Sequence, residues 1–457
     1  MSFAYPAFDD SGPRRLFEGL EYSLANGQAG LILGNADAGK STLSKIVCGL
    51  VPRFTGGDLR GTVRLGGGDI GAQKPFELTD KVALVFQNAD EQILTTRCDT
   101  EIAFALESLG AEPQDIKRRV HESLSSLGLV DFAARNPATL SGGEKKRLLL
   151  ACALAVDPPL WILDEAFEEL DAAWKEAVLQ RLHDSAKTVL FLDSRWSALY
   201  NGVVSSICVL EHGKLHRRQT TPLDGFSPLR AKRAASHAGE PVLRAQGVTF
   251  SFPGSAAFSL TVDDLVLERG SVCALVGANG SGKSTLGRIL CGLLKPQTGV
   301  VAVMGKGAHT PLQSRVGYMF QNPDYQIFLP TVREELSFGL RGLGASEIHR
   351  RVAEALELFR LPDGETPPAL MSYGSRKRLQ AATYYLLDRD VMILDEVDSG
   401  LSYSDFMPVL DALRSKNSAI VLITHDAELA ALVSDRTVVM EAGRITGGSG
   451  GESSRGA

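Results

Sequence analysis

Two short segments of the sequence have the composition of a phosphate-binding loop. Residues 34–41 and 277–284 both fit the pattern G-x-x-x-x-G-K-S. Each follows an apolar run typical of a strand and opens a run typical of a helix. In such a loop, backbone N–H groups converge on a phosphate, and the helix N-terminus adds partial positive charge. The residues expected to contact the phosphates of a nucleotide are Gly34, Asn35, Gly39, Lys40, Ser41 and Thr42, and Gly277, Asn279, Gly280, Gly282, Lys283, Ser284 and Thr285; of these, Ser41 and Ser284 would also hold Mg²⁺.

Two other segments end an apolar run with two carboxylates, Asp164-Glu165 and Asp395-Glu396. A buried parallel strand would deliver the first carboxylate to a metal ion. The second would lie near the γ-phosphate, where a base or a water-orienting group is needed. Such a segment alone could equally be a helix cap. Its position after a phosphate loop, twice in the chain, predicts metal binding by each aspartate and a catalytic role for each glutamate.

The paired motifs recur in the same order along the chain, which indicates an internal repeat. The separation is 243 residues for Lys40 and Lys283, 234 for Gln87 and Gln321, and 231 for Ser141 and Ser372 and for Asp164 and Asp395. A nearly constant separation predicts two copies of one α/β domain with a mainly parallel sheet and a helical subdomain. We place the first domain at 1–220, a linker at 221–240, the second domain at 241–446 and a flexible tail at 447–457.

Composition narrows the class of protein. The 457 residues carry 48 Lys plus Arg against 54 Asp plus Glu, a net charge of −6, which argues against a nucleic-acid binder. The six cysteines form no C-x-x-C pair and are expected to be buried small hydrophobes in a reducing compartment. The longest apolar run, 148–156, is far shorter than the ~20 residues that span a bilayer. We therefore expect a cytoplasmic protein.

At Leu140-Ser141-Gly142-Gly143-Glu144, before the first Asp-Glu pair, the sequence resembles the ATP-binding cassette (ABC) family. The segment is similar to the family's signature motif, which contacts the γ-phosphate of ATP held by the other half of a head-to-tail dimer; an ordinary serine helix cap is the alternative. The resemblance implies that the following residues also act at ATP: Ser141, Gly142, Gly143 and Ser372 as signature residues, Gln87 and Gln321 as Q-loop glutamines on the metal, and Tyr5 and Phe252 as adenine-stacking aromatics or, alternatively, core residues.

Residues 86–93 and 320–328 resemble more narrowly the Q loop and following short helix of energy-coupling-factor (ECF) transporter ATPases. Those proteins work with an integral membrane coupling subunit and a substrate-binding membrane subunit, importing vitamins or transition-metal ions. The carboxylates that would then accept hydrogen bonds from arginines of the coupling helices are Asp90, Glu91 and Asp324. Simple solvation of these side chains at the surface is the alternative. The resemblance implies an ATPase peripheral to the cytoplasmic face of the membrane, whose halves pair with each other.

The resemblance also predicts two unequal ATP sites. The site built on Lys283, Gln321, Glu396 and His425, with the first-half signature, matches the family throughout. The other site departs from it at four positions: Asp37 in the phosphate loop, Ser194 in place of the switch histidine, Tyr373 in the second signature and Ser402 in the D loop. We expect one hydrolytic site and one slow site. Neutral drift with both sites active is the alternative, and the retained Glu165 favours it.

A different class of protein fits the same motifs. Twin-cassette ATPases that act on ribosomes or nucleic acid also have two cassettes and no membrane span, but they join them by a long, charged helical linker. DNA-repair ATPases of this kind carry coiled-coil or zinc-binding insertions, and neither is visible here. The sequence does not identify the transported solute, because specificity would reside in a separate membrane subunit.

Overall fold

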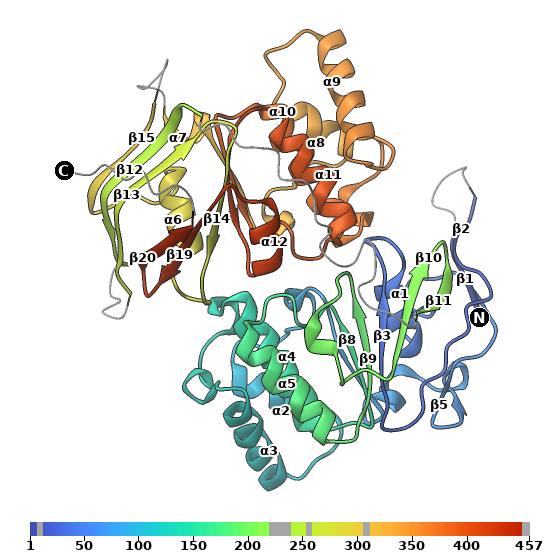
Figure 1. Cartoon of the computed structure of the whole chain (residues 1–457). Coiled ribbons are helices and arrows are strands. Elements are labelled where there is room, and N and C mark those ends of the chain that lie inside the picture. The colour runs from blue at the N-terminus through green and yellow to red at the C-terminus, as the bar shows by residue number, and fades with distance from the viewer. Residues whose placement is uncertain (7–11, 219–238, 253–257, 305–310, 450–457) are drawn as a thin grey trace. The chain divides into compact units, whose positions relative to one another are not determined.

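The computed structural model describes residues 1–6, 12–218, 239–252, 258–304 and 311–449. Contacts between residues divide the chain into two compact units, Met1–Ser227 and Pro228–Ala457 (Figure 1). Most of the segment that the sequence assigns to a linker, 221–240, lies outside the described residues. None of the helices described has the length and apolar character needed to cross a bilayer.

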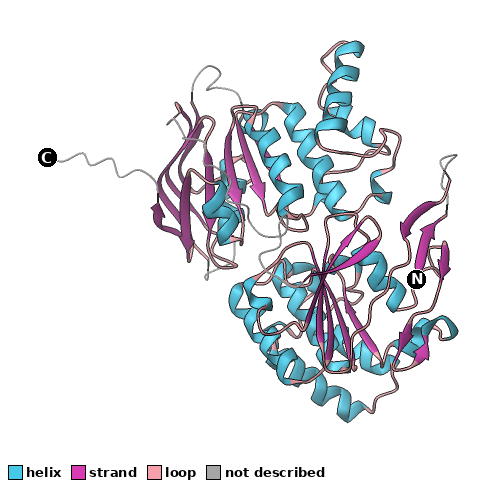
Figure 2. Cartoon of the chain, turned by 45° about the vertical axis from the view of Figure 1, so that its right-hand side comes forward, coloured by secondary structure: helices cyan, strands magenta, loops and turns pink. Residues whose placement is uncertain are grey.

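The first unit is built on a six-stranded sheet whose two faces pack against different helices (Figure 2). Its strands follow the order β11 (Lys214–Arg218), β10 (Ser206–Glu211), β3 (Ala29–Leu33), β9 (Thr188–Asp193), β8 (Leu160–Asp164) and β7 (Val82–Val85). All neighbours are parallel except β10 and β11. Alternate residues of β8 face opposite sides: Trp161 packs with the helices α4 and α5, and Ile162 packs with α1.

Smaller elements complete the first unit. The helices are α1 (Lys40–Val47), α2 (Cys98–Ser108), α3 (Pro113–Ser126), α4 (Gly142–Val156) and α5 (Ala172–Asp184). An antiparallel sheet joins β2 (Arg14–Phe17), β1 (Ser2–Tyr5) and β4 (Asp58–Arg60), and a hairpin joins β5 (Arg64–Leu65) and β6 (Gly68–Asp69). The helices α2 and α3, between the Q loop and the signature, pack on α4 and form the helical subdomain.

The second unit repeats this plan within one nine-stranded sheet. Its strands follow the order β15 (Thr298–Val303), β12 (Pro241–Phe250), β13 (Leu260–Glu268), β20 (Arg444–Ser449), β19 (Arg436–Glu441), β14 (Val272–Val276), β18 (Ala419–Ile423), β17 (Val391–Asp395) and β16 (Val316–Met319). The parallel run β14-β18-β17-β16 has the same order as β3-β9-β8-β7. The expected fold class, two tandem α/β P-loop domains with antiparallel parts, is confirmed.

The helices of the second unit are α6 (Lys283–Leu290), α7 (Leu312–Arg315), α8 (Val332–Phe338), α9 (Ala345–Leu358), α10 (Tyr373–Leu387), α11 (Tyr403–Arg414) and α12 (Ala427–Val433). The helices α8 and α9 lie beside α10 in Figure 1 and form this unit's helical subdomain. The sequence placed the start of a tail at residue 447, and this boundary is wrong. Strand β20 continues to Ser449, because backbone pairing with β19 holds the glycines at 447 and 448 in the sheet.

Candidate functional site

Each expected phosphate loop connects a strand of the parallel core to the helix that follows it. The loop lies between β3 and α1 in the first unit and between β14 and α6 in the second. Both helices begin after a glycine with positive φ, 102° at Gly39 and 103° at Gly282. Residues with a side chain rarely adopt this conformation. A Cβ atom at Gly277 would lie 2.2 Å from the carbonyl oxygen of Met440, so glycine is required there as well.

The two loop lysines are held by the backbone of their own loops. Lys40 Nζ donates to the carbonyl of Gly34 at 2.7 Å, and Lys283 Nζ donates to the carbonyl of Gly277 at 2.8 Å. Both lysines are buried. The positive charge that a bound phosphate requires is therefore fixed at the loop. The remaining expected loop residues lie in the same two segments: Asn35, Ser41 and Thr42 in the first, and Asn279, Gly280, Ser284 and Thr285 in the second.

The loops differ at one backbone position. Asp37 occupies the place of Gly280, and both have positive φ, 67° and 76° respectively. An aspartate tolerates this conformation better than most residues, at a cost of about 1 kcal/mol relative to glycine. The first loop therefore carries both backbone strain and an extra negative charge.

The aspartates that were expected to hold a metal end two equivalent strands. Asp164 is the last residue of β8, and Asp395 is the last residue of β17. The backbone N–H of the next residue, Glu165 or Glu396, donates to the neighbouring strand at 2.8 or 2.9 Å. Both glutamates have positive φ, 48° and 50°. The same turn therefore presents the second carboxylate in both units.

The buried aspartates have a donor set that suits a divalent cation. Burial raises the pKa of Asp164 to about 6, and its Oδ1 atom has no hydrogen-bond partner among the described residues. In the second unit, burial likewise raises the pKa of Asp395, and Ser284 Oγ donates to its Oδ1 at 2.9 Å. A hard cation ligated by these oxygens would satisfy the buried carboxylates and favour their ionised form. The residues present therefore fit Mg²⁺.

Sequence reasoning missed one contact of Asp395. Tyr318 in β16 donates its hydroxyl to Asp395 Oδ2, and burial together with this carboxylate raises the pKa of Tyr318. Leu84 occupies the equivalent position in β7 and has no hydroxyl, so it cannot make this contact with Asp164. A tyrosine within a buried strand gives no sequence signal that separates it from the core.

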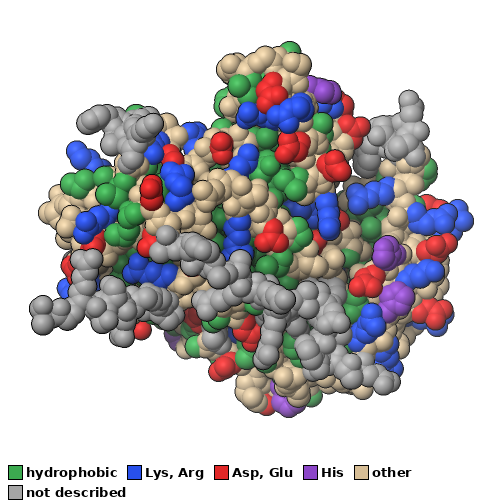
Figure 3. Space-filling view, turned by 45° about the horizontal axis from the view of Figure 1, so that its top comes forward, with side chains coloured by type: hydrophobic (Ala, Val, Ile, Leu, Met, Phe, Trp, Pro, Cys, Tyr) green, Lys and Arg blue, Asp and Glu red, His purple; other side chains and the backbone are tan. Residues whose placement is uncertain are grey.

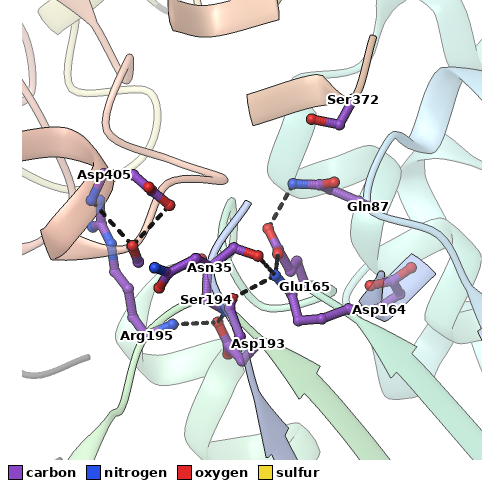
Figure 4. Close-up of polar contacts among 12 residues, drawn as sticks. Asn35, Gln87, Asp164, Glu165, Asp193, Ser194, Arg195, Ser372 and Asp405 are labelled. Carbon is purple, nitrogen blue, oxygen red and sulfur yellow. Dashed lines mark hydrogen bonds and ion pairs between the residues drawn. The ribbon is translucent and has the colours of Figure 1, made fainter. Parts of the chain in front are cut away.

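The second carboxylates have different partners in the two units. Glu396 Oε1 lies 2.7 Å from His425 Nε2. Burial acts to raise the pKa of Glu396, but the hydrogen bond and charge of His425 hold it below its usual value. In the first unit, Glu165 instead lies 3.0 Å from Lys40 Nζ and accepts a 2.5 Å hydrogen bond from Gln87 Nε2 (Figure 4). The second unit thus offers an ionised base in Glu396, whereas in the first unit Glu165 is tied to the phosphate loop.

The sheet register confirms that Ser194 and His425 are equivalent. In the first unit Asp164 pairs with Leu192, and Ser194 lies two residues after Leu192. In the second unit Asp395 pairs with Ile423, and His425 lies two residues after Ile423. Ser194 is buried, and its hydroxyl has no hydrogen-bond partner among the described residues. The preceding Asp193 accepts from the Tyr200 hydroxyl at 2.6 Å. Among the described residues of the first unit, no imidazole therefore lies beside Glu165.

A family model described as an ABC transporter matches residues 17–168 and 260–399, which contain both phosphate loops and both Asp-Glu pairs. The chain belongs to the ABC transporter family. ABC ATPases bind ATP, generally with Mg²⁺, and hydrolyse it, so this chain is an ATPase with two fused cassettes.

Relatives match along nearly the whole chain. An ABC transporter ATP-binding protein of Streptomyces avermitilis is 32% identical over 95% of this chain and 91% of its own, and one of Treponema denticola is 30% identical over 93% and 92%. A solved model of ribosome-bound archaeal Pelota and ABCE1 has a TM-score of 0.68 at 21% identity, covering 97% of this chain and 77% of that one. The last likeness concerns the ABC fold alone.

The signature serine of each ABC cassette caps a helix. Ser141 Oγ accepts from the backbone N–H of Glu144 at 3.4 Å, and the Glu144 side chain accepts from the N–H of Ser141 at 2.7 Å. Ser372 Oγ accepts from the N–H of Ser375 at 3.1 Å. Gly142 and Gly143 form the first turn of α4, whereas Tyr373 is the first residue of α10. The helix cap, given above as the alternative, is thus observed. The Ser141 hydroxyl also donates its proton to the Glu144 carboxylate at 2.8 Å. Contact of the two serines with ATP stays a prediction.

The D-loop residues of the two ABC cassettes also act as caps. Asp171 accepts from the N–H of Trp174 at 3.0 Å and is the N-cap residue that precedes α5. Ser402 accepts from the N–H of Asp405 at 3.2 Å and is the N-cap residue that precedes α11. A serine therefore replaces the aspartate at this position without loss of the cap.

The two aromatics expected at adenine lie beside the helices that follow the ABC phosphate loops. The Tyr5 hydroxyl is 2.9 Å from Thr42 Oγ1 in the first turn of α1. Phe252 is exposed, and its ring centroid lies 5.8 Å from that of Phe258, which packs against Gly282. These positions are compatible with stacking on a base, which stays a prediction.

Replacing Asp37 with glycine should tighten ATP binding by the first ABC cassette roughly five- to tenfold. The change removes a carboxylate near the phosphates, and two charges ~4 Å apart interact by about 1 kcal/mol in water and more in a partly dry site. It also gives the positive-φ position to a residue that adopts it freely. A fluorescent ATP analogue would be titrated into the Lys283→Ala chain, whose second loop is disabled. Gly280→Asp in the Lys40→Ala chain is the reciprocal control and should weaken binding. Unchanged affinity on Asp37→Gly would contradict this reasoning.

Proposed function

We propose that the chain is the ATP-hydrolysing subunit of an energy-coupling-factor importer, which drives uptake of a vitamin or a transition-metal ion through separate membrane subunits. The proposal rests on the similarity of residues 86–93 and 320–328 to the Q-loop segments of those ATPases. The observation that carries it is the exposure of large apolar side chains next to both segments. The chain would act at the cytoplasmic face of the membrane.

These apolar side chains lie at the end of a short 3₁₀ turn in each unit, Ala89–Glu91 and Pro323–Tyr325, or within three residues after it. Leu94 is 73% exposed, Tyr325 67% and Phe328 68%. The Phe328 ring also lies edge-on to the exposed Phe338, with centroids 5.8 Å apart. Large apolar side chains exposed at equivalent places suit a partner that covers them.

Acidic residues of the same turns supply the polar part of this surface. Asp90 is paired with Lys145 at 2.6 Å, and Asp324 is paired with Arg376 at 2.7 Å, each within its own unit. Their side chains are still 44% and 41% exposed. Glu91 accepts from Asn88 Nδ2 at 3.2 Å. The carboxylates would share their free lone pairs with arginines of the coupling helices, as expected from the sequence.

In the proposed cycle, the two units bind ATP between one phosphate loop and the opposite signature, and the linker makes this pairing intramolecular. Hydrolysis takes place with the residues of the second unit. Glu396 accepts the proton of the attacking water, His425 orients that water, and Lys283 offsets the phosphate charge. Ser284, Asp395 and Gln321 would hold Mg²⁺, which supplies charge neutralisation on the phosphates.

The site built on the first phosphate loop would bind ATP and hydrolyse it slowly. Lys40, Ser41, Gln87 and Asp164 provide the same groups for phosphate and metal. Glu165 is held by Lys40 and Gln87, and no histidine faces it in the part of the chain that the structure describes. Binding there would keep the units together while the second site turns over.

The alternative is a twin-cassette ATPase that acts on ribosomes or nucleic acid. The match to ribosome-bound ABCE1 supports the fold of this alternative but not its function, because identity is 21%. The net charge of −6 disfavours a phosphate-rich partner. Basic and acidic side chains are interspersed on the face that Figure 3 shows. The importer therefore remains the proposal.

Co-purification tests the proposal. The tagged full-length chain, extracted from native membranes in mild detergent, should retain integral membrane proteins, and the complex should hydrolyse ATP after reconstitution into liposomes. Leu94→Glu with Phe328→Glu should release those proteins while ATP-analogue binding is unchanged. Phe76→Glu, at an equally exposed phenylalanine away from the Q loops, is the matched control and should retain them. Sedimentation of the chain with ribosomes, without any membrane protein, would overturn the proposal.

A further inference from the structure

A lysine occupies the same place in the two signature helices and is buried in both. Lys146 lies in α4 and Lys377 in α10, 231 residues apart like the signature serines. Their exposed fractions are 1% and 0%. A buried ammonium group is costly unless it is fully hydrogen-bonded. The acceptors of each lysine therefore indicate what it holds in place.

In the first unit the lysine holds the Q loop (residues 86–88). Lys146 Nζ donates to the carbonyl of Phe86 at 2.7 Å and to that of Gln87 at 2.5 Å. Both acceptors are backbone atoms of the segment that carries the Q-loop glutamine. The signature helix and the Q loop of this unit are thus joined through one side chain.

In the second unit the same lysine holds different atoms. Lys377 Nζ donates to the carbonyl of Glu396 at 2.8 Å, and to the carbonyl and hydroxyl of Ser399 at 2.5 and 2.7 Å. The two Q-loop carbonyls have other donors here. The Gln380 side chain donates to the carbonyl of Phe320 at 3.1 Å, and the Tyr373 hydroxyl donates to that of Gln321 at 3.1 Å.

Two residue differences explain why the two lysines bind different backbone atoms. Tyr373 and Gln380 of α10 occupy the positions of Gly142 and Leu149 in α4. Neither glycine nor leucine has a side-chain donor. Because shielded carbonyls need partners, the lysine must serve the Q loop in the first unit. In the second unit Tyr373 and Gln380 donate to the Q-loop carbonyls instead, so Lys377 can bind other acceptors.

We propose that Lys377 is a positioning residue for Glu396, and that Tyr373 and Gln380 enable this role by holding the Q loop in its place. Glu396 has a φ of 50°, and its carbonyl is fixed by Lys377 while its side chain meets His425 at 2.7 Å. Glu165 has the same backbone conformation without a lysine on its carbonyl, since Lys146 is engaged at the Q loop. Tyr373 is thus a working part of the second unit rather than a decayed signature glycine.

Hydrogen exchange of the full-length chain distinguishes this role from simple core packing. In Lys377→Met, amides of residues 396–401 should exchange at least tenfold faster, while those of 87–89 stay within twofold. In Lys146→Met, the matched control with the same burial, residues 87–89 should exchange faster, while 165–170 stay within twofold. The proposal is overturned if Lys377→Met leaves the exchange rates of amides 396–401 unchanged. It is also overturned if Lys146→Met raises the exchange rates of amides 165–170 as much as those of 87–89.

Steady-state kinetics adds a second readout. Lys377→Met should lower kcat about tenfold and leave the KM for ATP within twofold, because the lysine contacts the backbone of Glu396 and not the nucleotide. A rise in KM without loss of kcat would count against the proposal. This result does not depend on any membrane partner, so it can fail while the importer role stands, and the reverse is also true.

A variant that leaves the lysine intact covers the case in which Lys377→Met does not fold. Tyr373→Phe with Gln380→Leu removes both Q-loop donors and nearly preserves volume. Lys377 should then turn to the carbonyls of residues 320 and 321, as Lys146 does in its own unit. Amides of 396–401 should exchange faster although the lysine is unchanged. Unchanged exchange there would show that the lysine does not choose between the two sets of carbonyls, and would overturn the proposal.

Discussion

Replacing Glu396 with glutamine should lower the steady-state ATPase rate at least 100-fold. The carboxylate lies 2.7 Å from His425, which holds its pKa below the usual value, so it is ionised at neutral pH and able to accept a proton. A positioned general base contributes roughly 10²- to 10⁴-fold to a rate. Glutamine keeps the size of the side chain but cannot take the proton. Phosphate release by the full chain, alone and in complex with the proposed membrane partner, measures the loss.

The matched variant Glu165→Gln should retain activity within about threefold. Glu165 ends an equivalent strand, but its oxygens face Lys40 and Gln87 rather than a histidine. It therefore lacks the group that would orient water beside it. ATP-analogue binding by both variants serves as the control for folding. Equal losses of turnover in the two variants would mean that both sites hydrolyse ATP, and would contradict the asymmetry.

Repetition made much of the fold predictable from the sequence. Both phosphate loops and both Asp-Glu strands lie in short, uninterrupted segments, and their nearly constant separation predicts two copies of one domain. The sheet confirms this, because β3-β9-β8-β7 and β14-β18-β17-β16 have the same order. Local periodicity works here since buried parallel strands are continuous apolar runs. The equivalence of Ser194 and His425, derived from residue counting alone, agrees with the register.

The contacts that escaped prediction depend on partners distant in sequence. Tyr318 differs from a core tyrosine only because Asp395 lies within reach of its hydroxyl across 77 residues. Lys146 and Lys377 occupy the same place in their helices and yet bind backbone atoms of different segments, 60 residues away at Phe86 and 19 residues away at Glu396. The end of β20 was missed since glycines that pair with a neighbouring strand look like a linker.

Replacing His425 with alanine should lower kcat about 100-fold and leave the KM for ATP within threefold. His425 is the group that contacts the base, and its removal takes away both the water-orienting imidazole and an interaction that lowers the pKa of Glu396. Loss of such a group typically costs 10²- to 10⁴-fold in rate. The effect falls on kcat because the lysine and serine of the phosphate loop remain to bind ATP.

The first unit supplies the matched control. Ser194→Ala removes a buried hydroxyl that has no hydrogen-bond partner among the described residues, so turnover should change less than twofold. If the hydroxyl oriented water at the first site, that substitution would lower kcat in proportion to the first site's share of turnover. A loss of turnover comparable to that of His425→Ala would therefore indicate that both sites hydrolyse ATP. A small loss, with His425→Ala nearly inactive, assigns turnover to the site that contains Glu396.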